Sequence, residues 1–132
     1  MTTTFNLEEK RLKEEIRKRK AKRVLIQLPE GLKPYGSYLA SIAEKTGALA
    51  IVSADPCYGA CDLAISEADS LDADLIVHYG HSKLIEGKRK INTIYIEAKA
   101  KSNVKNTVKK ALPLLKVYNL SLIHISEPTR PY

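Results

Sequence analysis

The sequence predicts an α/β domain, an open three-layer arrangement around a mainly parallel four-stranded sheet. Short apolar runs alternate with amphipathic segments over residues 22–116, which is the pattern of strands that alternate with helices. Such an alternation implies right-handed crossovers and therefore parallel strands. A length of 132 residues is enough for one hydrophobic core of this kind but not for two.

The first helix is expected to begin with Asn6 as its N-cap and to bury Leu7, Leu12 and Ile16, because these apolar residues form one narrow stripe. The apolar run at 22–28 ends at Pro29 and predicts a buried strand. Further strands are expected at 48–53, 74–79 and 92–97, and further helices at 32–46, 61–70 and 103–116, the last interrupted or ended near Pro113.

Three regions are expected along the chain: a basic N-terminal helix at 1–21, the α/β domain at 22–119, and a tail at 120–132. The tail contains LSLIHISEPTR, which resembles the translation of a transposase adapter used to prepare sequencing libraries. We therefore expect residues 120–132 to be foreign to the native fold and His124 to have no function.

Charge is unevenly distributed along the chain. Residues 8–23 carry nine Lys or Arg against four Glu, whereas residues 24–82 carry two Lys against eight Asp or Glu. Residues 83–116 are basic again. Aromatic residues do not interleave with the basic runs, so solvated helix faces explain the charge better than a nucleic-acid surface does.

The N-terminal segment lacks the apolar stretch of a signal peptide, and no apolar run approaches the roughly 20 residues of a membrane span. The chain has two cysteines. We therefore expect a cytoplasmic protein without a membrane role, in a reducing compartment where a disulfide is disfavoured.

The loops at 29–33, 55–62 and 80–83 each follow an expected strand. In parallel sheets, ligands bind outside the carboxyl ends of the strands. Both cysteines and two of the three histidines, His78 and His81, lie in these loops or at the adjoining strand end. Any chemistry is therefore expected at this edge.

Cys57 and Cys61 allow three interpretations: a disulfide, a zinc site completed by His78 and His81, or an iron–sulfur centre. The spacing of the two cysteines matches the first gap of C-x-x-x-C-x-x-C, but Ala64 stands in the place of the third cysteine. The chain therefore does not have the ordinary radical-SAM motif.

PEGLK after the first strand, YGACDLA after the second and VHYGHS at the end of the third together resemble the diphthamide-synthesis radical-SAM family, in its archaeal form. The resemblance covers essentially residues 20–119. It implies an enzyme of three similar domains, of which this chain is the first, each contributing one cysteine to a 4Fe–4S cluster. The cluster binds S-adenosylmethionine, and a 3-amino-3-carboxypropyl group is transferred to a histidine of translation elongation factor 2.

The resemblance implies that the cysteine of YGAC, Cys61, is the iron ligand and that Cys57 is a bystander. Small neighbours would let a cluster approach, and a thiolate at a helix start would be stabilised by backbone N–H groups. For His78, a hydrogen-bonded structural role is the more common one for a histidine at the end of an apolar strand, and contact with the cofactors is the alternative. The residues expected to contact the cofactors are Glu30, Gly31, Gly59, Ala60, His78, Gly80, His81 and Ser82.

Within that list, Gly31 is expected in a conformation that favours glycine, and Glu30 is a candidate partner for an ammonium group. The full enzyme is expected to be a homodimer that acts on elongation factor 2, and this chain alone to be inactive. Two alternatives remain: a basic α/β module that binds RNA or elongation factor, and a small zinc or thiol-redox protein that needs both cysteines.

Overall fold

The computed structural model describes residues 4–83 and 91–115. The chain divides into two compact units, Met1–Lys101 and Ser102–Tyr132. The first unit contains α1 (Glu9–Arg19), β1 (Arg23–Gln27), the 3-10 helix η1 (Glu30–Tyr35), α2 (Gly36–Glu44), β2 (Leu49–Val52), α3 (Ile65–Ser70), β3 (Leu75–Tyr79) and β4 (Asn92–Ile96). The second contains α4 (Lys105–Leu115), which includes Pro113 in its interior.

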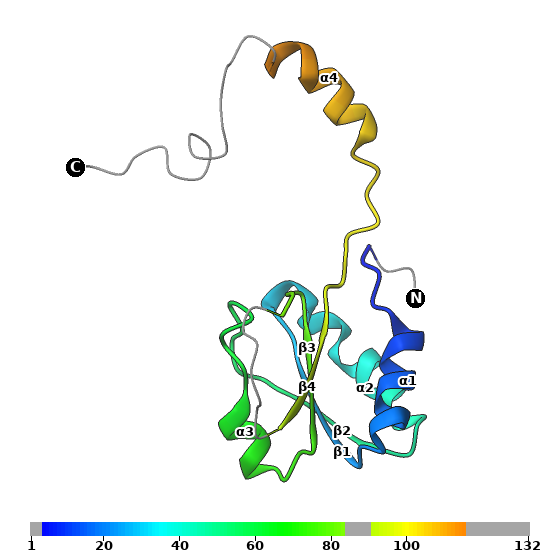
Figure 1. Ribbon diagram of the computed structural model, residues 1–132, viewed down its shortest axis with the longest axis vertical. Helices are drawn as coiled ribbons and strands as arrows, with labels where there is room; N and C mark the ends of the chain where they lie inside the picture. The colour runs from blue at the N-terminus through cyan, green and yellow to red at the C-terminus, as the bar shows by residue number, and fades with distance from the viewer. Residues whose placement is uncertain (1–3, 84–90, 116–132) are drawn as a thin grey trace, which may run out of the picture. The chain divides into compact units, whose positions relative to one another are not determined.

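The four strands form one sheet in the order β2-β1-β3-β4, and every pairing between neighbours is parallel. The first unit therefore has the α/β fold that the sequence predicts. Figure 1 shows α1 and α2 on one face of the sheet and α3 on the other. The three-layer arrangement is thus confirmed.

Alternate residues of the central strands feed two separate cores. Val24 and Ile26 of β1 point into the larger core under α1 and α2, together with Leu12 and Ile16. Leu25 points to the opposite face, into a smaller core with Ala68 of α3. Strands buried on both faces read as continuous apolar runs, and this explains why the strands were the clearest elements in the sequence.

The helix boundaries differ from the predictions in two places that matter. α1 begins after Glu8 rather than after Asn6, whose side-chain Oδ1 instead accepts a hydrogen bond from the Glu8 N–H at 3.3 Å. The prediction of Asn6 as N-cap is therefore wrong by two residues. α3 begins at Ile65, so the predicted helix start at residue 61 is also wrong.

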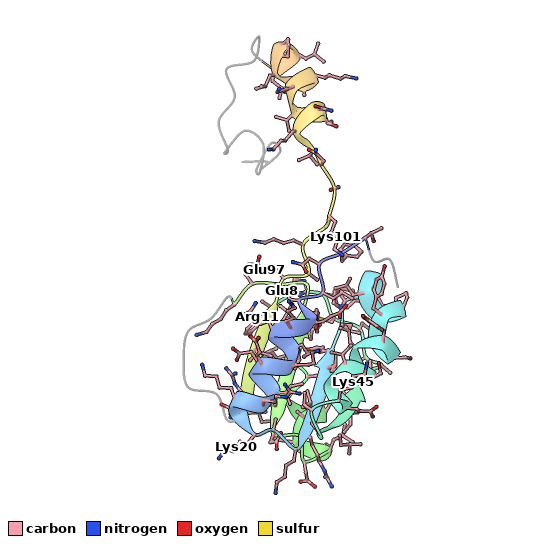
Figure 2. All side chains as sticks on the ribbon, turned by 90° about the vertical axis from the view of Figure 1, so that its right-hand side faces the viewer. Glu8, Arg11, Lys20, Lys45, Glu97 and Lys101 are labelled. Carbon is pink, nitrogen blue, oxygen red and sulfur yellow. The ribbon has the colours of Figure 1, made fainter. Side chains whose placement is uncertain are left out.

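Charged side chains cover the outer surface of the first unit (Figure 2). Glu8, which precedes α1, forms an ion pair of 3.0 Å with Arg11 of α1. Together with Glu97 and Lys99, these two residues line a pocket beside the end of β4. Within the described residues, no helix has the length and apolar character needed to cross a bilayer. The predicted tail at 120–132 and the domain boundary at 119 lie outside the described residues.

Candidate functional site

The site lies at the carboxyl edge of the sheet, where the order of the strands reverses. The chain runs from β1 outward to β2 and then returns to place β3 on the other side of β1. Loops that leave neighbouring strands in opposite directions open a crevice at such a point, and ligands of open α/β sheets bind there. His78 lies on β3 at this edge, opposite Gln27 at the end of β1.

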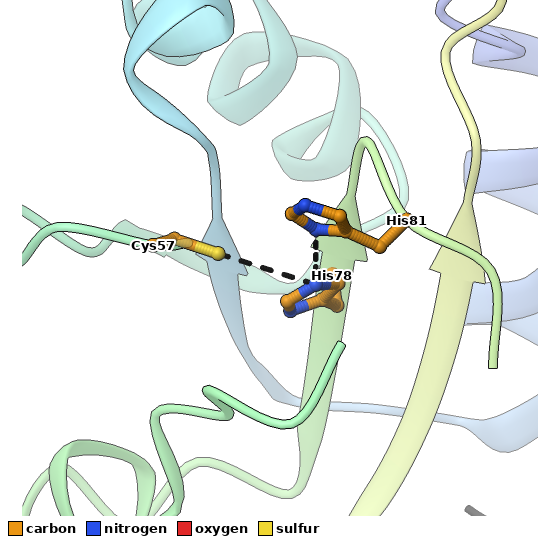
Figure 3. Close-up of side chains that lie close together, drawn as sticks. All are labelled: Cys57, His78 and His81. Carbon is orange, nitrogen blue, oxygen red and sulfur yellow. Dashed lines mark hydrogen bonds between the residues drawn. The ribbon is translucent and has the colours of Figure 1, made fainter. Parts of the chain in front are cut away.

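Three potential metal ligands converge at this edge of the sheet. The Cys57 Sγ lies 4.0 Å from the His78 Nε2, and the same Nε2 lies 2.9 Å from the His81 Nδ1. One donor atom from each residue falls within 4.8 Å of the other two. Figure 3 shows the thiol of Cys57 pointing from its loop toward His78, with the ring of His81 beside that of His78. Cys57 and His78 are buried, and His81 is half-buried.

Gln27 determines which nitrogen of His78 faces the other two residues. Its Nε2 donates to the Asp62 carbonyl at 2.7 Å, and its Oε1 accepts from the Ala64 N–H at 3.3 Å. These two bonds fix the orientation of the amide. The same Oε1 lies 2.9 Å from the His78 Nδ1, so Nδ1 carries the proton and donates it. The lone pair of a neutral ring is therefore on Nε2, directed at Cys57 and His81.

The loop that carries the two cysteines is held at several points. The Asp62 Oδ2 accepts from the Tyr58 N–H at 3.2 Å, and the Lys33 Nζ donates to the Ala54 carbonyl at 2.7 Å. Burial raises the pKa of the Cys57 thiol, and the neighbouring Asp62 carboxylate raises it further. Cys57 therefore stays a protonated thiol to higher pH than an exposed cysteine does.

Cys61 has a different environment although it lies only four residues further on. Both thiols are free, but Cys61 is exposed whereas Cys57 is buried. Cys61 lies in a turn ahead of α3, which begins at Ile65, so the helix dipole expected to favour its thiolate does not act there. A Cβ added to Gly59 would lie 3.6 Å from the Cys61 Sγ, an ordinary contact distance.

Gly80, not Gly31, has the backbone conformation that favours glycine. Gly80 has a φ of +84°, and a Cβ there would lie 2.7 Å from the Pro29 Cγ. Gly31 lies outside the positive-φ region, and no atom would lie within 4 Å of its Cβ. The expectation for Gly31 was therefore wrong. The turn at Gly80 sends the chain back across Pro29 and directs His81 toward His78.

The remaining predicted residues have separate environments and partners. The Glu30 carboxylate forms an ion pair of 2.6 Å with the Lys33 Nζ. The ammonium group of a ligand would therefore have to displace Lys33 in order to bind Glu30. The Ser82 Oγ donates to the Glu97 Oε1 at 2.5 Å. That hydrogen bond, followed by contacts with Lys99, lowers the pKa of Glu97. Ala60 is buried. Their proposed contacts with cofactors stay predictions.

Sequence reasoning missed Gln27 and Asp62. Gln27 lies in an apolar run that predicts only a strand, yet it is one of three buried polar residues in the described part of the chain. A single amide at the end of an apolar run was the available signal, because a buried polar side chain must find partners. Asp62 carried no comparable signal, since its main contact with Gln27 uses a backbone carbonyl.

These features define a parallel α/β domain with thiol and imidazole donors at the switch point of its sheet. The chain belongs to the family of diphthamide synthesis proteins, whose profile matches residues 28–126.

Individual relatives agree with this assignment. The chain is 43% identical over 95 residues to 2-(3-amino-3-carboxypropyl)histidine synthase subunit 1 of Schizosaccharomyces pombe, which covers 70% of this chain and 22% of the relative. It is 49% identical over 71 residues to the subunit of the same name from Danio rerio, covering 53% of this chain and 19% of the relative.

A solved structure is also similar. The crystal structure of Dph2 from Pyrococcus horikoshii with a 4Fe–4S cluster matches 85% of this chain and 33% of the Dph2 chain, with a TM-score of 0.77 and 31% identity. The chain thus spans about a fifth of these curated relatives and a third of Dph2.

Proposed function

We propose that this chain is the first domain of an enzyme for the first step of diphthamide biosynthesis, and that it supplies Cys61 as one ligand of a 4Fe–4S cluster. The enzyme would transfer a 3-amino-3-carboxypropyl group from S-adenosylmethionine to a histidine of translation elongation factor 2. The observation that carries the proposal is the exposed thiol of Cys61 at the switch point of the sheet, in a chain similar to a protein that holds such a cluster.

The residues around Cys61 are compatible with one cluster ligand. A ligand that shares a cluster with other domains must reach out of its own domain, and the exposure of Cys61 meets that need. A Cβ at Gly59 would lie 3.6 Å from the Cys61 Sγ, so the space beside the thiol would also accept a small side chain at this position. When bound, the cluster would supply the electron for reductive cleavage of S-adenosylmethionine. A 4Fe–4S cluster is held by cysteine thiolates, and with Cys57 buried, the other thiolates would come from further domains.

Other residues of this edge would position the substrate. Glu30 lies after β1 and forms an ion pair with Lys33. The ammonium of S-adenosylmethionine would take the place of the Lys33 ammonium beside the Glu30 carboxylate. His81 is half-buried and lies on the turn made by Gly80, where it would donate to a carboxylate. The substrate site would be completed by Gly31, Gly59, Ala60 and Ser82. His78 would hold His81 in place through the 2.9 Å contact between their ring nitrogens.

The wider setting is part of the same proposal. We place the enzyme in the cytoplasm, as a homodimer of the archaeal type with elongation factor 2 as its protein substrate. The similarity to Dph2 from Pyrococcus horikoshii is the observation behind the archaeal type, whereas the curated relatives reported above are eukaryotic.

The test is the transfer of radiolabelled 3-amino-3-carboxypropyl from S-adenosylmethionine to elongation factor 2, in the complete enzyme that carries this domain. Cys61→Ser should abolish transfer, because a serine oxygen is a poor ligand for iron that prefers thiolates. Cys57→Ser is the matched control and should retain most of the activity, since Gln27 and Asp62 still hold the loop. Full activity of the Cys61 variant would overturn the proposal.

A further inference from the structure

We propose that Cys57, His78 and His81 form a second metal site, which binds a single Zn²⁺ ion through one thiolate and two imidazoles, with water as the fourth ligand. Cys61 takes no part in it. This site shares His78 and His81 with the substrate contacts proposed above, but it does not include the iron ligand Cys61 and does not depend on that assignment. Its basis is the convergence of three donor atoms within 4.8 Å of one another at the switch point of the sheet.

The distances are close to those of a tetrahedral site. Zinc lies about 2.3 Å from sulfur and about 2.0 Å from nitrogen, so tetrahedral ligands are separated by about 3.3 Å for two nitrogens and about 3.5 Å for sulfur and nitrogen. The observed separations are 2.9 Å between the histidine nitrogens and 4.0 Å between the Cys57 Sγ and the His78 Nε2. Each of these two separations therefore has to change by about half an ångström. The third pair, the Cys57 sulfur and the His81 donor, lies within 4.8 Å and has to come to about 3.5 Å.

The surroundings of His78 favour a ligand role over a purely structural one. Histidines that bind metals usually donate their other ring N–H to a fixed acceptor, which sets the tautomer. Gln27 is that acceptor here, because its amide is held by Asp62 and Ala64 and receives the Nδ1 proton at 2.9 Å. The Nε2 lone pair is thereby directed at the place where the other two donors meet (Figure 3).

The donor set selects the kind of cation. A thiolate with two imidazoles suits Zn²⁺ and other borderline-soft ions, whereas Mg²⁺ and Ca²⁺ prefer oxygen ligands. Without a metal, burial keeps the Cys57 thiol protonated, so binding would release that proton to solvent as the thiolate coordinates the ion. His81 is half-buried, so the proposed site lies at the boundary between core and surface, and a water molecule would be the fourth ligand.

The geometry also explains why Cys61 is left out. Cys57 is buried and turned toward the histidines, whereas Cys61 is exposed and outside the group of converging donors. The two thiols of one loop therefore have separate tasks. A four-ligand zinc site made of both cysteines and both histidines, which the sequence allowed, does not correspond to this arrangement.

The test uses Co²⁺ as a spectroscopic probe for Zn²⁺, added to the iron-free 132-residue chain under anaerobic conditions with a non-thiol reductant. We expect one Co²⁺ per chain, with the visible bands of a tetrahedral ion and a sulfur-to-cobalt charge-transfer band, both removed by one equivalent of Zn²⁺. Cys57→Ser should lose the charge-transfer band. Cys61→Ser is the matched control and should keep the full spectrum.

His81→Ala guards against misfolding of the Cys57 variant, because His81 is half-buried and its loss spares the core. It should weaken Co²⁺ binding at least about tenfold, while circular dichroism stays unchanged. Loss of the charge-transfer band in Cys61→Ser, or no stoichiometric tetrahedral Co²⁺ in the unmodified chain, would overturn the zinc site. Either result would leave the transfer assay with Cys61→Ser to decide the iron ligand separately.

Discussion

Replacement of Gly80 by alanine should destabilise the protein strongly, because the new Cβ meets both a backbone and a packing conflict. Gly80 has a φ of +84°, and an L-residue in the left-handed region costs about 1–2 kcal/mol. The Cβ would also lie 2.7 Å from the Pro29 Cγ and 3.3 Å from its Cδ. A proline ring cannot rotate away, so overpacking adds about 1–3 kcal/mol.

Together these two conflicts predict a loss of about 2–5 kcal/mol in the free energy of unfolding, or about 10–20 °C in Tm. Urea and thermal unfolding of the 132-residue chain, followed by circular dichroism, measure it. Gly31→Ala is the matched control. Its Cβ meets no atom within 4 Å, so the effect should lie between neutral and a gain of about 1 kcal/mol.

Equal losses for the two glycine variants would refute the reasoning. So would a loss below about 1 kcal/mol for Gly80→Ala, since the strained φ alone accounts for that much. Because the turn at Gly80 directs His81 toward His78, the same variant should also weaken Co²⁺ binding, whereas Gly31→Ala should not.

Three further predictions concern the groups around the site and the core. Gln27→Leu removes the hydrogen-bond partner of the His78 Nδ1 and of the Asp62 carbonyl. The free energy of unfolding in urea should fall by about 2–3 kcal/mol. An unchanged free energy of unfolding would show that these hydrogen bonds do not stabilise the protein. Burial raises the pKa of Tyr79 far above its usual value, so stability should fall as pH rises above the ordinary tyrosine pKa of about 10, where only the unfolded state ionises. Tyr79→Phe should reduce this loss of stability at high pH. At neutral pH it should lower the free energy of unfolding by about 1 kcal/mol, because the hydrogen bond to the Leu7 carbonyl is lost. An unchanged dependence of stability on pH would contradict the raised pKa of Tyr79. Mass spectrometry after timed alkylation should find Cys61 modified well before Cys57, which is buried and has a raised pKa, and equal rates would contradict the burial.

The sheet could be predicted because its central strands, β1 and β3, are buried on both faces. Val24, Leu25 and Ile26 fill two cores from one continuous apolar run, and the short length of this run and the Pro29 that follows favour a strand. The location of the site followed from the same logic, since parallel strands place their exit loops at one edge. The spacing of the two cysteines alone does not predict that Cys57 is buried whereas Cys61 is exposed.

The details of the site depend on contacts between residues far apart in the sequence. Gln27 orients His78 although the two residues are 51 positions apart in the sequence. The spacing of apolar residues along the chain does not predict such a pair. Gly80 and Gly31 look alike in sequence, but only Gly80 crosses over Pro29. A further contact of this kind lies just ahead of α3, which starts at Ile65, because the Gln27 Oε1 accepts a hydrogen bond from the Ala64 N–H.

The central claim is that Cys61, and not Cys57, is the iron ligand of this domain. The most direct measurement is the iron and acid-labile sulfide content of the complete enzyme after anaerobic reconstitution, for Cys61→Ser and Cys57→Ser side by side. The account predicts that the Cys61 variant loses its cluster whereas the Cys57 variant keeps it. A Cys57 variant without a cluster, beside a Cys61 variant that retains one, would contradict the account and exchange the roles of the two thiols.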